Sequence, residues 1–435
     1  MTPKPGTESY LVIGGCGFLG RHIVEMLINR GETQVAVFDI VQRHFDTNVS
    51  FYVGDISDED QISGALRKFN TSVVIHTASP IHGLSKEIYE KVNVIGTQTV
   101  IAASIQTGVR KLVFTSSAGV VYDGEENLVD VDERLDYPKV AMDAYNDTKA
   151  RAEQAVLEAN GKGGLLTCAL RPAGIFGPGD RQALVGFAQV IKNNQTKFQL
   201  GNNTNLFDWT YVSNVAHAHL LAADRLGSSV SMESFDEPLQ PIEATSLPSI
   251  RIPTSDSKPL GPNPNPTEDD KKLSQIYADA STALDVAKPV LRTKFDQFAN
   301  PAPDPEDPEA EKPVESVSVA GQAFFITNCE PVYFWDFARA IWAEMGHVAP
   351  WTISLPKPIG IVLARLAEGW AKISGKEPGF TAYRVKFSTQ ARYYNNERAR
   401  RVLGYEPIVS VHDGIKMAVA WYKETEAEKA AAIKA

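Results

Sequence analysis

The sequence has few cysteines and no apolar run long enough to span a membrane. Cys16, Cys168 and Cys329 are too few for a disulfide framework in a chain of 435 residues, which favours a reducing compartment. No stretch reaches the roughly 20 uninterrupted apolar residues of a transmembrane helix. The first residues, MTPKPGTES, are polar, so we expect no secretory signal.

Basic residues are also in the minority, since 43 Lys and Arg face 53 Asp and Glu, for a formal net charge of -10. A protein that binds nucleic acid needs a basic face, so this balance argues against a nucleic-acid partner. The apolar fraction of 43% is typical of a globular protein. The length suffices for one large domain or two ordinary ones.

The first 175 residues alternate short apolar runs with longer stretches of helical spacing. The predicted strands are residues 10–13, 34–38, 50–53, 72–76, 111–115 and 165–171, and the predicted helices are 18–30, 58–69 and 86–106. This alternation predicts an α/β fold of Rossmann type, a doubly wound parallel sheet covered by helices on both faces. Ligands of such folds bind at the carboxyl ends of the strands.

Prolines are concentrated in one part of the chain, because 14 of the 26 lie between residues 228 and 320. Such a segment predicts a surface insertion that is largely disordered, with one possible helix at 269–298. The globular pattern resumes with a strand at 322–327 and a helix at 333–345. We therefore predict three parts, listed as follows: a dinucleotide-binding domain at 8–175, to which 207–226 returns; a smaller, C-terminal substrate-binding region at 176–206 and 321–425; and the insertion at 228–320.

A glycine-rich turn follows the first predicted strand and opens the first predicted helix. Gly14, Gly17 and Gly20 in the segment YLVIGGCGFLGRH permit a tight turn and let the backbone approach a pyrophosphate at the helix N-terminus. With the intervening Phe18 and Leu19, they are the expected cofactor contacts of this loop. The alternative is a purely structural turn.

Two acidic residues stand at the ends of the next strands. Asp39 lies 19 residues after Gly20, where it would accept hydrogen bonds from the adenosine ribose and repel a 2′-phosphate, which favours NAD over NADP. Asp55 and Ile56 follow the third strand and are expected to flank the adenine. Alternatively, Asp39 only caps a loop.

Tyr145 and Lys149 are four residues apart on a predicted helix and therefore share a face. A free tyrosine has a pKa near about 10, which a lysine ammonium and the nicotinium charge of NAD would lower. Tyr145 could then take the proton of an alcohol while hydride leaves for nicotinamide. Ser117, after the predicted strand 111–115, could bind the same oxygen. The alternative for Tyr145 and Lys149 is an ordinary surface pair.

These motifs resemble the extended short-chain dehydrogenase family, which includes 3β-hydroxysteroid dehydrogenases and nucleotide-sugar epimerases. The resemblance covers roughly 8–227 and 321–425 and rests on the following segments: IGGCGFLGRH (13–22), HTASPIHG (76–83), VNVIGT (92–97), FTSSAGVVYDG (114–124), MDAYNDTKARAE (142–153), ALRPAGIFGPGDRQ (169–182), LFDWTYVSNVAHAHLLA (206–222) and GYEP (404–407). Within the family, the set looks like the members that oxidise the 3β-hydroxyl of a 4α-carboxysterol with loss of CO₂.

The resemblance implies roles for individual residues. Tyr145 would accept the proton, Lys149 would bind the cofactor and Ser117 would assist. Further positions are carried over as cofactor contacts or as positioning groups: Ala78, Pro172 and Ile175 at the cofactor, and Asn93 orienting the site or a water. For the substrate carboxylate, Arg181 is the candidate, because a guanidinium pairs well with a carboxylate; a surface salt bridge is the alternative.

The resemblance also implies a sterol carboxylate as substrate and peripheral attachment to the cytosolic face of the endoplasmic reticulum membrane. It allows partner enzymes of sterol C-4 demethylation, and a homodimer. Residues 356–376 have one apolar face and could lie in a membrane interface, but we favour a core helix that walls the substrate cleft. His217 and His219 are two apart on a predicted helix and face different ways, so we expect no metal site.

Three other functions remain open at this point. A nucleotide-sugar epimerase or dehydratase, and a 3β-hydroxysteroid dehydrogenase of a secondary pathway, would share the same site motifs. A non-catalytic NAD-sensing protein would share the fold but would usually lack the pair of Tyr145 and Lys149.

Overall fold

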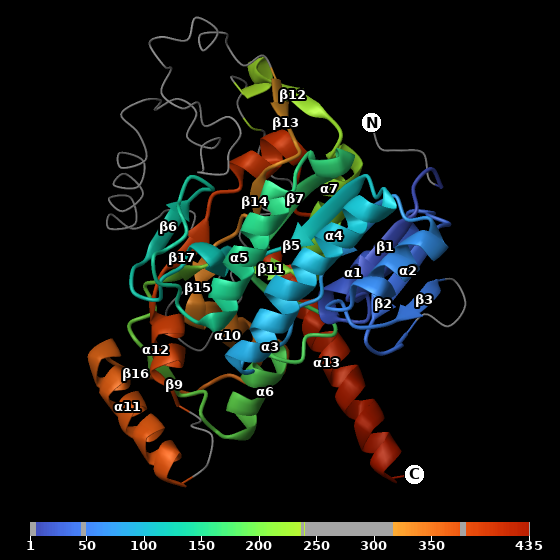
Figure 1. Cartoon of the computed structure of the whole chain (residues 1–435). Helices are drawn as coiled ribbons and strands as arrows, with labels where there is room; N and C mark the ends of the chain where they lie inside the picture. The colour runs from blue at the N-terminus through green and yellow to red at the C-terminus, as the bar shows by residue number, and fades with distance from the viewer. Residues whose placement is uncertain (1–5, 45–48, 236–238, 240–315, 375–379, 435) are drawn as a thin grey trace, which may run out of the picture.

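A seven-stranded sheet forms the centre of the structure, a computed structural model that describes residues 6–44, 49–235, 239, 316–374 and 380–434 (Figure 1). Its strands are β1 (Tyr10–Ile13), β2 (Val35–Asp39), β3 (Ser50–Val53), β4 (Val73–His76), β5 (Lys111–Thr115), β7 (Leu166–Pro172) and β14 (Ala323–Ile326). They lie in the order β14-β7-β5-β4-β1-β2-β3, and every pair is parallel. The chain winds outward from β1 in both directions, which confirms the predicted Rossmann-type fold.

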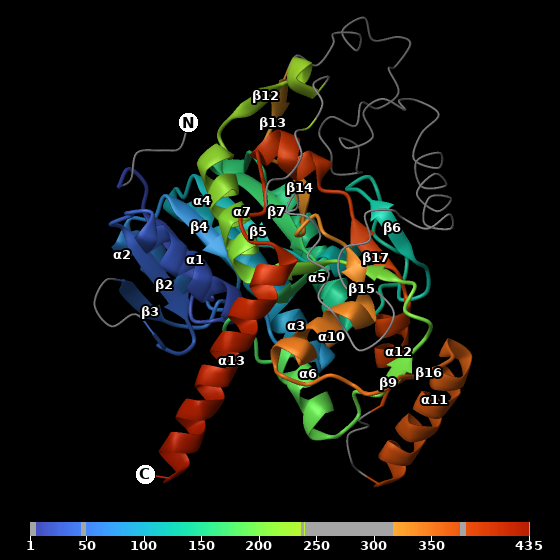
Figure 2. The ribbon, with the colours of Figure 1, turned by 180° about the vertical axis from the view of Figure 1, so that it is seen from behind.

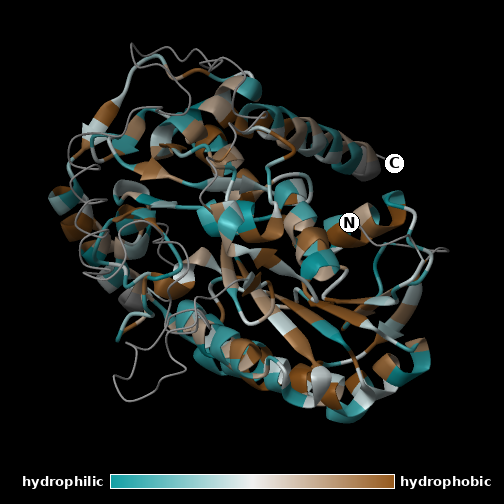
Figure 3. Ribbon diagram, turned by 90° about the horizontal axis from the view of Figure 1, so that it is seen from above, coloured by the Kyte–Doolittle hydropathy of each residue, from teal (hydrophilic) through white to brown (hydrophobic). Residues whose placement is uncertain are grey.

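Helices cover both faces of this sheet, and β1 shows why. Tyr10 and Val12 pack in the cluster that includes α1 (Phe18–Asn29) and α7 (Val212–Arg225). Leu11 and Ile13 pack on the other face, in the cluster that includes α2 (Glu59–Phe69), α4 (Thr97–Thr107) and α5 (Ala144–Glu158). Because side chains alternate between the faces of a strand, an entirely apolar strand needs a helical layer on each side. Figure 3 shows the hydrophobic strands enclosed between helices.

The predicted helix at 86–106 has three parts, namely α3 (Lys86–Tyr89), the π-helical turn η1 (Glu90–Gly96) and α4. Asn93 is buried within η1. A π-helical turn contains one more residue than an α-helical one and frequently occurs at functional sites. This irregularity therefore directs attention to the side chain of Asn93.

The smaller region is built around a four-stranded sheet and an aromatic cluster. The strands lie in the order β15 (Val332–Tyr333), β10 (Leu206–Phe207), β17 (Arg392–Tyr394) and β6 (Leu128–Val131). Helices α6 (Ala183–Lys192), α10 (Phe334–Glu344) and α13 (Val411–Lys434) pack around Trp209, whose ring stacks on Phe337 with centroids 4.3 Å apart. None of these strands was predicted, since each has only two to four residues.

Two short strand pairs and several turns complete the described structure. Strand β8 (Gly174–Phe176) pairs with β11 (Trp209–Tyr211), and β9 (Phe198–Leu200) pairs with β16 (Ile353–Leu355). The remaining elements are the turns η2 (Ala118–Val121), η3 (Lys162–Gly164), η4 (Met232–Phe235) and η6 (Ala399–Leu403) and the helices α11 (Lys357–Ser374) and α12 (Ala382–Thr389). Among the described residues, no helix has both the length and the apolar character that crossing a bilayer requires.

The two ends of the predicted insertion are joined. Strand β12 (Ser229–Ser231) pairs antiparallel with β13 (Ser316–Ser318), and Val317 is buried in the core. Residues 240–315, with the possible helix at 269–298, lie outside the described residues. The sequence assigned all of 321–425 to the substrate-binding region, whereas β14 is the edge strand of the large sheet.

Helix α11 lies at the periphery of the molecule in Figure 1 and, seen from behind, in Figure 2. It turns small residues inward: Gly360, Ala364 and Ala371 are buried. Its large apolar side chains are exposed: Ile359, Val362, Leu363, Leu366 and Trp370. The prediction of a core helix is therefore wrong for these side chains, and their role as a wall of the substrate cleft stays a prediction.

Candidate active site

The glycine-rich turn between β1 and α1 brings two backbone segments into close contact. Gly14 has a φ of +78°, and a Cβ atom there would lie 2.7 Å from the backbone nitrogen of Ala78. A Cβ on Gly20 would overlap the Gly14 carbonyl group, and the Gly17 N–H donates to that same oxygen over 2.9 Å. Larger residues would push β1, β4 and α1 apart, so the glycines keep the turn tight.

The N-terminus of α1 is suited to a phosphate. Gly17 precedes the helix, and neither a side-chain cap nor an acidic residue occupies its first turn. Its unpaired N–H groups and the positive end of the helix dipole therefore remain for an anion. Phe18 and Leu19 begin this helix. Leu19 is buried in the core, so it can meet a ligand only through its backbone.

The two carboxylates predicted near the ends of neighbouring strands, Asp39 and Asp55, lie there in the structure. Asp39 ends β2, and its Oδ2 accepts a hydrogen bond from the Cys16 N–H over 3.0 Å. Asp55 follows β3, and Lys91 donates to its Oδ2 over 2.7 Å. This bond, with those from Ser57, lowers the pKa of Asp55 to about 2. Asp39 thus lies beside the glycine turn, and Asp55 carries a fixed negative charge next to the buried Ile56.

The remaining cofactor candidates lie at the same edge of the sheet. Ala78 follows β4 and is half-buried against Gly14, while Pro172 ends β7. Ile175 is half-buried in β8. Because parallel strands end at one edge, the residues after β1, β2, β4 and β7 lie along the same border of the sheet. The cradle at Gly14, the open helix end and Asp39 together fit a dinucleotide without a 2′-phosphate.

Tyr145 is fixed by residues from outside its own helix. It lies in the first turn of α5, which Asp143 caps by accepting the Asn146 N–H over 2.8 Å. The Tyr145 ring packs on His82, with centroids 4.0 Å apart, and edge-on against Tyr89 at 5.7 Å. Both partners come from the segment after β4, so the phenol stands beside the chain that leaves this strand. His82 lies in HTASPIHG, one of the segments that carry the resemblance, whereas Tyr89 lies in none of them.

The ionisation of Tyr145 and Lys149 differs from the expectation. Burial raises the pKa of Tyr145 to about 12, and a hydrogen bond with the Ser79 side chain opposes this rise. Burial also lowers the pKa of Lys149 to about 7, against the effect of Glu153. For the protein groups alone, the prediction of a lowered tyrosine pKa is wrong, because desolvation outweighs the polar neighbours. That prediction also included the positive charge of the nicotinium ring of NAD, which is not one of the protein's own groups.

Lys149 is held deep in the site rather than on the surface. It is 2% exposed, its Nζ donates to the Thr115 carbonyl, and it lies 4.2 Å from the centre of the Phe114 ring. Tyr145 is half-buried one helical turn earlier. This burial excludes the alternative of an ordinary surface pair, since such a pair would leave both side chains in water.

A chain of hydrogen bonds connects Tyr145 to the π-helical turn. The Ser79 hydroxyl donates to Asn93 Oδ1, and Asn93 Nδ2 donates to Thr148 Oγ1, each over 3.0 Å. Thr148 Oγ1 lies 2.9 Å from the Ala144 carbonyl oxygen and 3.0 Å from that of Tyr145, and its one proton serves these two acceptors. Asn93 was expected from the resemblance, and the structure brings it to the site. Ser79 and Thr148 lie in the segments HTASPIHG and MDAYNDTKARAE that carry the resemblance, but they were not predicted as site residues, because a hydroxyl side chain alone does not indicate a role.

Ser117 stands at the end of β5, just before η2. Its Oγ accepts the Gly119 N–H over 3.1 Å, and the side chain is half-buried. A hydroxyl that accepts one bond still has its proton to donate, so Ser117 can donate to a substrate oxygen. The adjacent Ser116 is buried, and among the described residues its Oγ has no hydrogen-bond partner.

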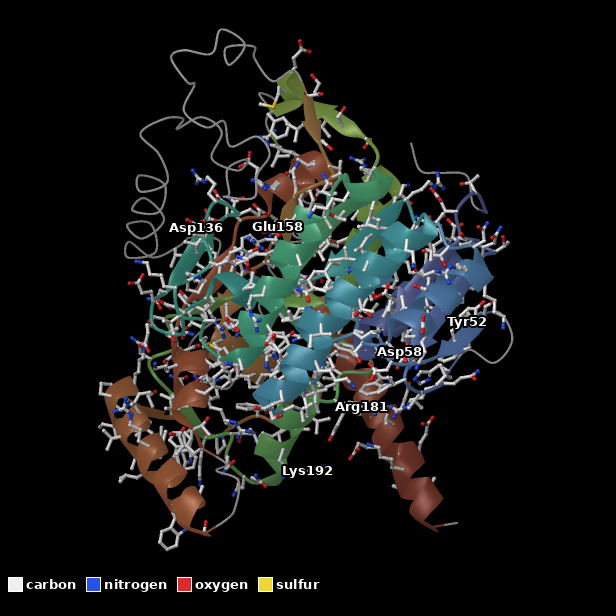
Figure 4. The ribbon with its side chains drawn as sticks, viewed as in Figure 1. Tyr52, Asp58, Asp136, Glu158, Arg181 and Lys192 are labelled. Atoms are coloured by element: carbon white, nitrogen blue, oxygen red, sulfur yellow. The ribbon has the colours of Figure 1, made fainter. Side chains whose placement is uncertain are left out.

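Arg181, the candidate for the substrate carboxylate, lies on the exposed loop before α6 (Figure 4). Its charge acts on His44, which follows β2 on the Asp39 side of the turn. Among the described residues Arg181 forms no ion pair. The surface salt bridge, which was the alternative role for Arg181, is therefore not found among them. The neighbouring motif residue Arg171 is instead buried, and its Nε donates to Glu153 over 3.0 Å.

The histidines of α7 have structural roles. His219 is buried, its Nε2 lies 2.7 Å from Thr115 Oγ1 and its Nδ1 lies 2.8 Å from the Val215 carbonyl oxygen. Burial lowers the pKa of His219 to about 4. His217, two residues earlier, is only half-buried. In the described ranges, no three His, Cys, Asp or Glu residues are grouped so as to hold a metal ion.

The fold and the site define a dinucleotide-dependent oxidoreductase of the short-chain type. More particularly, the chain belongs to the 3-beta hydroxysteroid dehydrogenase/isomerase family, whose model matches residues 11–237 and 309–357. It is 41% identical to sterol-4-alpha-carboxylate 3-dehydrogenase erg26, decarboxylating, of Schizosaccharomyces pombe, over 95% of this chain and 97% of that protein. The Saccharomyces cerevisiae protein of the same kind is 37% identical, over 96% and 98%.

Solved structures support the same architecture. The crystal structure of gox2253 superposes with a TM-score of 0.62 at 18% identity, over 96% of this chain and 99% of that one. UDP-glucose 4-epimerase of Thermus thermophilus, solved as a complex with NAD, gives a TM-score of 0.57 at 19% identity, over 95% and 99%. At these identities the likeness concerns the fold alone.

Proposed function

We propose that the protein oxidises the 3β-hydroxyl of a 4α-carboxysterol to a ketone, with NAD as the hydride acceptor and with loss of CO₂. One observation carries the reaction type: the glycine turn, Asp39, and the pair of Tyr145 and Lys149 meet at one edge of the sheet. The substrate class is supported by fungal relatives that carry this activity in their names and are 36–41% identical over nearly their full length.

The protein would hold the cofactor along the carboxyl edge of the sheet. The N–H groups at the start of α1 suit the pyrophosphate, Asp39 suits the adenosine ribose, and Lys149 suits the ribose next to the nicotinamide. When bound, NAD takes up the hydride that leaves C3 of the sterol. Pro172 and Ile175 would border the nicotinamide end.

The residues of this chain handle the proton. Ser117 donates a hydrogen bond to the substrate oxygen, and Tyr145 accepts the hydroxyl proton as the C3–H bond breaks. The contacts of Tyr145 with His82 and Tyr89 hold the phenol in place, so its position is set before the sterol arrives. The hydrogen bonds that link Ser79, Asn93 and Thr148 hold the same part of α5 in position.

Oxidation places a ketone β to the carboxylate, and this arrangement makes the loss of CO₂ easy. The bond from C4 to the carboxylate breaks, CO₂ leaves, and the electron pair passes to an enolate that later takes one proton at C4. Since burial keeps the pKa of Tyr145 high, the phenol retains the proton that it has accepted and can donate a hydrogen bond to the enolate oxygen. No additional lysine adduct is required.

Peripheral attachment to the cytosolic face of the endoplasmic reticulum membrane is part of this proposal, with other enzymes of sterol C-4 demethylation as partners. Its support is chemical: a sterol carboxylate is an amphiphile that resides in bilayers, so an enzyme that consumes it gains from working at their surface.

The direct test is to supply the purified full chain with NAD and a 4α-carboxysterol. We expect NADH and CO₂ to appear in equal amounts. A matched sterol without the carboxylate should give NADH and no CO₂. NADH from that sterol alone would indicate another 3β-hydroxysteroid dehydrogenase. Turnover of UDP-glucose would indicate an epimerase, and NAD binding without turnover of any of these would indicate a sensor.

A further inference from the structure

Arg392 is a buried cation that is surrounded by aromatic rings. It begins β17 and is 6% exposed. The central carbon of its guanidinium, Cζ, lies 4.6 Å from the centre of the Tyr122 ring, 4.7 Å from that of Phe207 and 4.3 Å from that of Phe387. These rings come from the end of η2, from β10 and from α12. Attraction between a cation and ring faces compensates part of the cost of burying the charge, but it gives the N–H groups no oxygen to bind.

Two neighbouring donors of Arg392, Nε and Nη2, are buried and have no hydrogen-bond partner among the described residues. These two nitrogens form one edge of the guanidinium plane, and that edge matches the two oxygens of a carboxylate. Arg171 shows the same edge in use, since its Nε and Nη2 donate to Glu153 over 3.0 Å and 2.5 Å. A buried donor without an acceptor destabilises a folded protein, so the edge of Arg392 indicates a ligand that completes it.

The carboxylates closest to Arg392 along the sheet and the loops bind other groups. The Asp208 N–H donates to the Arg392 carbonyl over 2.9 Å, but Asp208 Oδ2 accepts the Tyr394 N–H over 2.8 Å. Burial raises the pKa of Asp208 to about 8, so this side chain is protonated at neutral pH. Glu125, in the loop after η2, pairs with Lys386 of α12. The positive charge of Arg392 is therefore still suited to an added anion.

Tyr383 of α12 connects Arg392 with the catalytic phenol. The Tyr383 ring stacks on Phe387 with centroids 5.8 Å apart, and Phe387 in turn contacts the Arg392 guanidinium. Burial raises the pKa of Tyr383, and the charge of Arg392 opposes this rise. Tyr383 also acts on the ionisation of Tyr145, so Arg392 and Tyr145 both lie near this one side chain, which is 41% exposed. In Figure 1 and Figure 2 alike, α12 and β17 lie on the same side of the molecule.

The turn η2 is a second connection between Arg392 and the site. Ser117 precedes this turn of four residues and Tyr122 follows it. The Tyr122 carbonyl accepts the Met142 N–H over 3.3 Å, and Met142 lies three residues before Tyr145. The hydroxyl that can bind a substrate oxygen and the ring that packs on Arg392 therefore stand at the two ends of one short turn.

We propose that Arg392 binds the 4α-carboxylate of the sterol through Nε and Nη2, while Ser117 and Tyr145 bind the oxygen at C3. The inference rests on the proposed function for the identity of the ligand. Because aromatic rings enclose the two nitrogens, the carboxylate replaces ring contacts when it binds. C3 and C4 are adjacent carbons, so the two contacts together fix the orientation of the sterol ring before the C3–H bond breaks. Arg181, the candidate from the sequence, lies instead on the exposed loop before α6.

The test compares two sterols that differ only at C4, one with a 4α-carboxylate and one with a 4α-methyl group, in the purified full chain with NAD. Arg392→Met keeps an unbranched apolar side chain among the rings and removes the donors. Its kcat/KM for the carboxylated sterol should fall by about 100-fold, mainly through KM, while that for the methyl sterol stays within about two-fold. Arg392→Lys keeps the charge but not the two-pronged edge, so it should lose less.

Two further variants complete the comparison. Arg384→Met is the matched control, because it removes an exposed guanidinium from α12, and it should leave the ratio of the two kcat/KM values unchanged. Arg181→Met separates the two candidate arginines and should also leave that ratio unchanged. Turnover of the methyl sterol by Arg392→Met shows in the same assay that the variant folds.

Equal losses for the two sterols in Arg392→Met would mean that this arginine only supports the fold, and the proposal would be overturned. It would also be overturned if the selective loss occurred in Arg181→Met and not in Arg392→Met. If the native chain forms NADH from neither sterol, the proposed function falls, and calorimetry with the carboxylated sterol then decides the role of Arg392. Binding that is weaker by about ten-fold or more in Arg392→Met would support the site, and equal binding would overturn it.

Discussion

The Ser79 hydroxyl donates a hydrogen bond to Asn93 Oδ1 over 3.0 Å, and when Tyr145 is ionised the same proton can turn to the phenolate and lower the pKa of Tyr145. Ser79→Ala removes that bond, so the tyrosine should lose its proton at a higher pH. Because the deprotonated phenol is the base, kcat/KM should begin to rise at a higher pH than in the native enzyme. The pH profile of NADH formation measures this shift.

A control for this variant lies close by. Ser116→Ala removes a buried hydroxyl that has no hydrogen-bond partner among the described residues. Its pH profile should match that of the native enzyme. Equal shifts in the two variants, or none in Ser79→Ala, would show that Ser79 does not control the ionisation of Tyr145.

Tyr145→Phe keeps the ring that packs on His82 and Tyr89 but removes the hydroxyl. We expect NAD to bind with nearly unchanged affinity and kcat to fall by roughly 10²- to 10⁴-fold, the usual contribution of a general base. Titration of bound NAD and turnover assays separate the two effects. Near-native turnover would remove Tyr145 from the mechanism.

Asp39→Asn retains the size of the side chain and removes its charge. The preference for NAD over NADP, measured as the ratio of kcat/KM values, should fall by about ten-fold or more, because the repulsion of a 2′-phosphate is lost. Asp60→Asn, on the exposed first turn of α2, is the control and should leave the ratio unchanged. A ratio that stays constant in Asp39→Asn would mean that Asp39 serves only to bind the Cys16 N–H.

Glu153→Gln leaves the Arg171 guanidinium buried without its carboxylate partner. The free energy of unfolding should fall by roughly 3–5 kcal/mol, the usual cost of breaking a buried ion pair from one side. Adding Arg171→Met should restore part of that loss, because no unpaired charge then remains. Urea denaturation of the single and double variants measures both values, and a double variant that is less stable than the single would contradict this explanation.

Much of the large sheet was predictable because its strands carry local signals. Residues 10–13, 111–115 and 165–171 are apolar at nearly every position, and only a strand covered on both faces explains such runs. The four-stranded sheet was not predictable. Its strands β10 and β15 contain two residues each and are paired across more than a hundred residues of sequence. Neither the periodicity of apolar residues nor the length of an apolar run could therefore predict them.

The residues of the candidate site also fall into two groups, those that the sequence predicted and those that only the structure revealed. Gly14, Asp39 and Tyr145 belong to motifs with fixed spacing, and the sequence predicted their positions. His82, Ser79 and Thr148 act through contacts made after folding. The burial of Tyr145 also depends on other elements, and it reversed the expected direction of its pKa. For α11, helical spacing described the apolar face correctly but could not tell whether protein or solvent lies against it, since the period is the same in both cases.

The β12–β13 ribbon has a consequence for the evolution of the chain. Ser231 pairs with Ser316, so the two positions that flank residues 232–315 lie side by side. The cost of joining two neighbouring positions grows slowly with the number of residues between them, by only about 0.6 kcal/mol for each doubling. Natural variation in the length of the 236–315 segment should therefore leave the register of β14 untouched, and the ribbon offers a place to graft a reporter domain into a working enzyme.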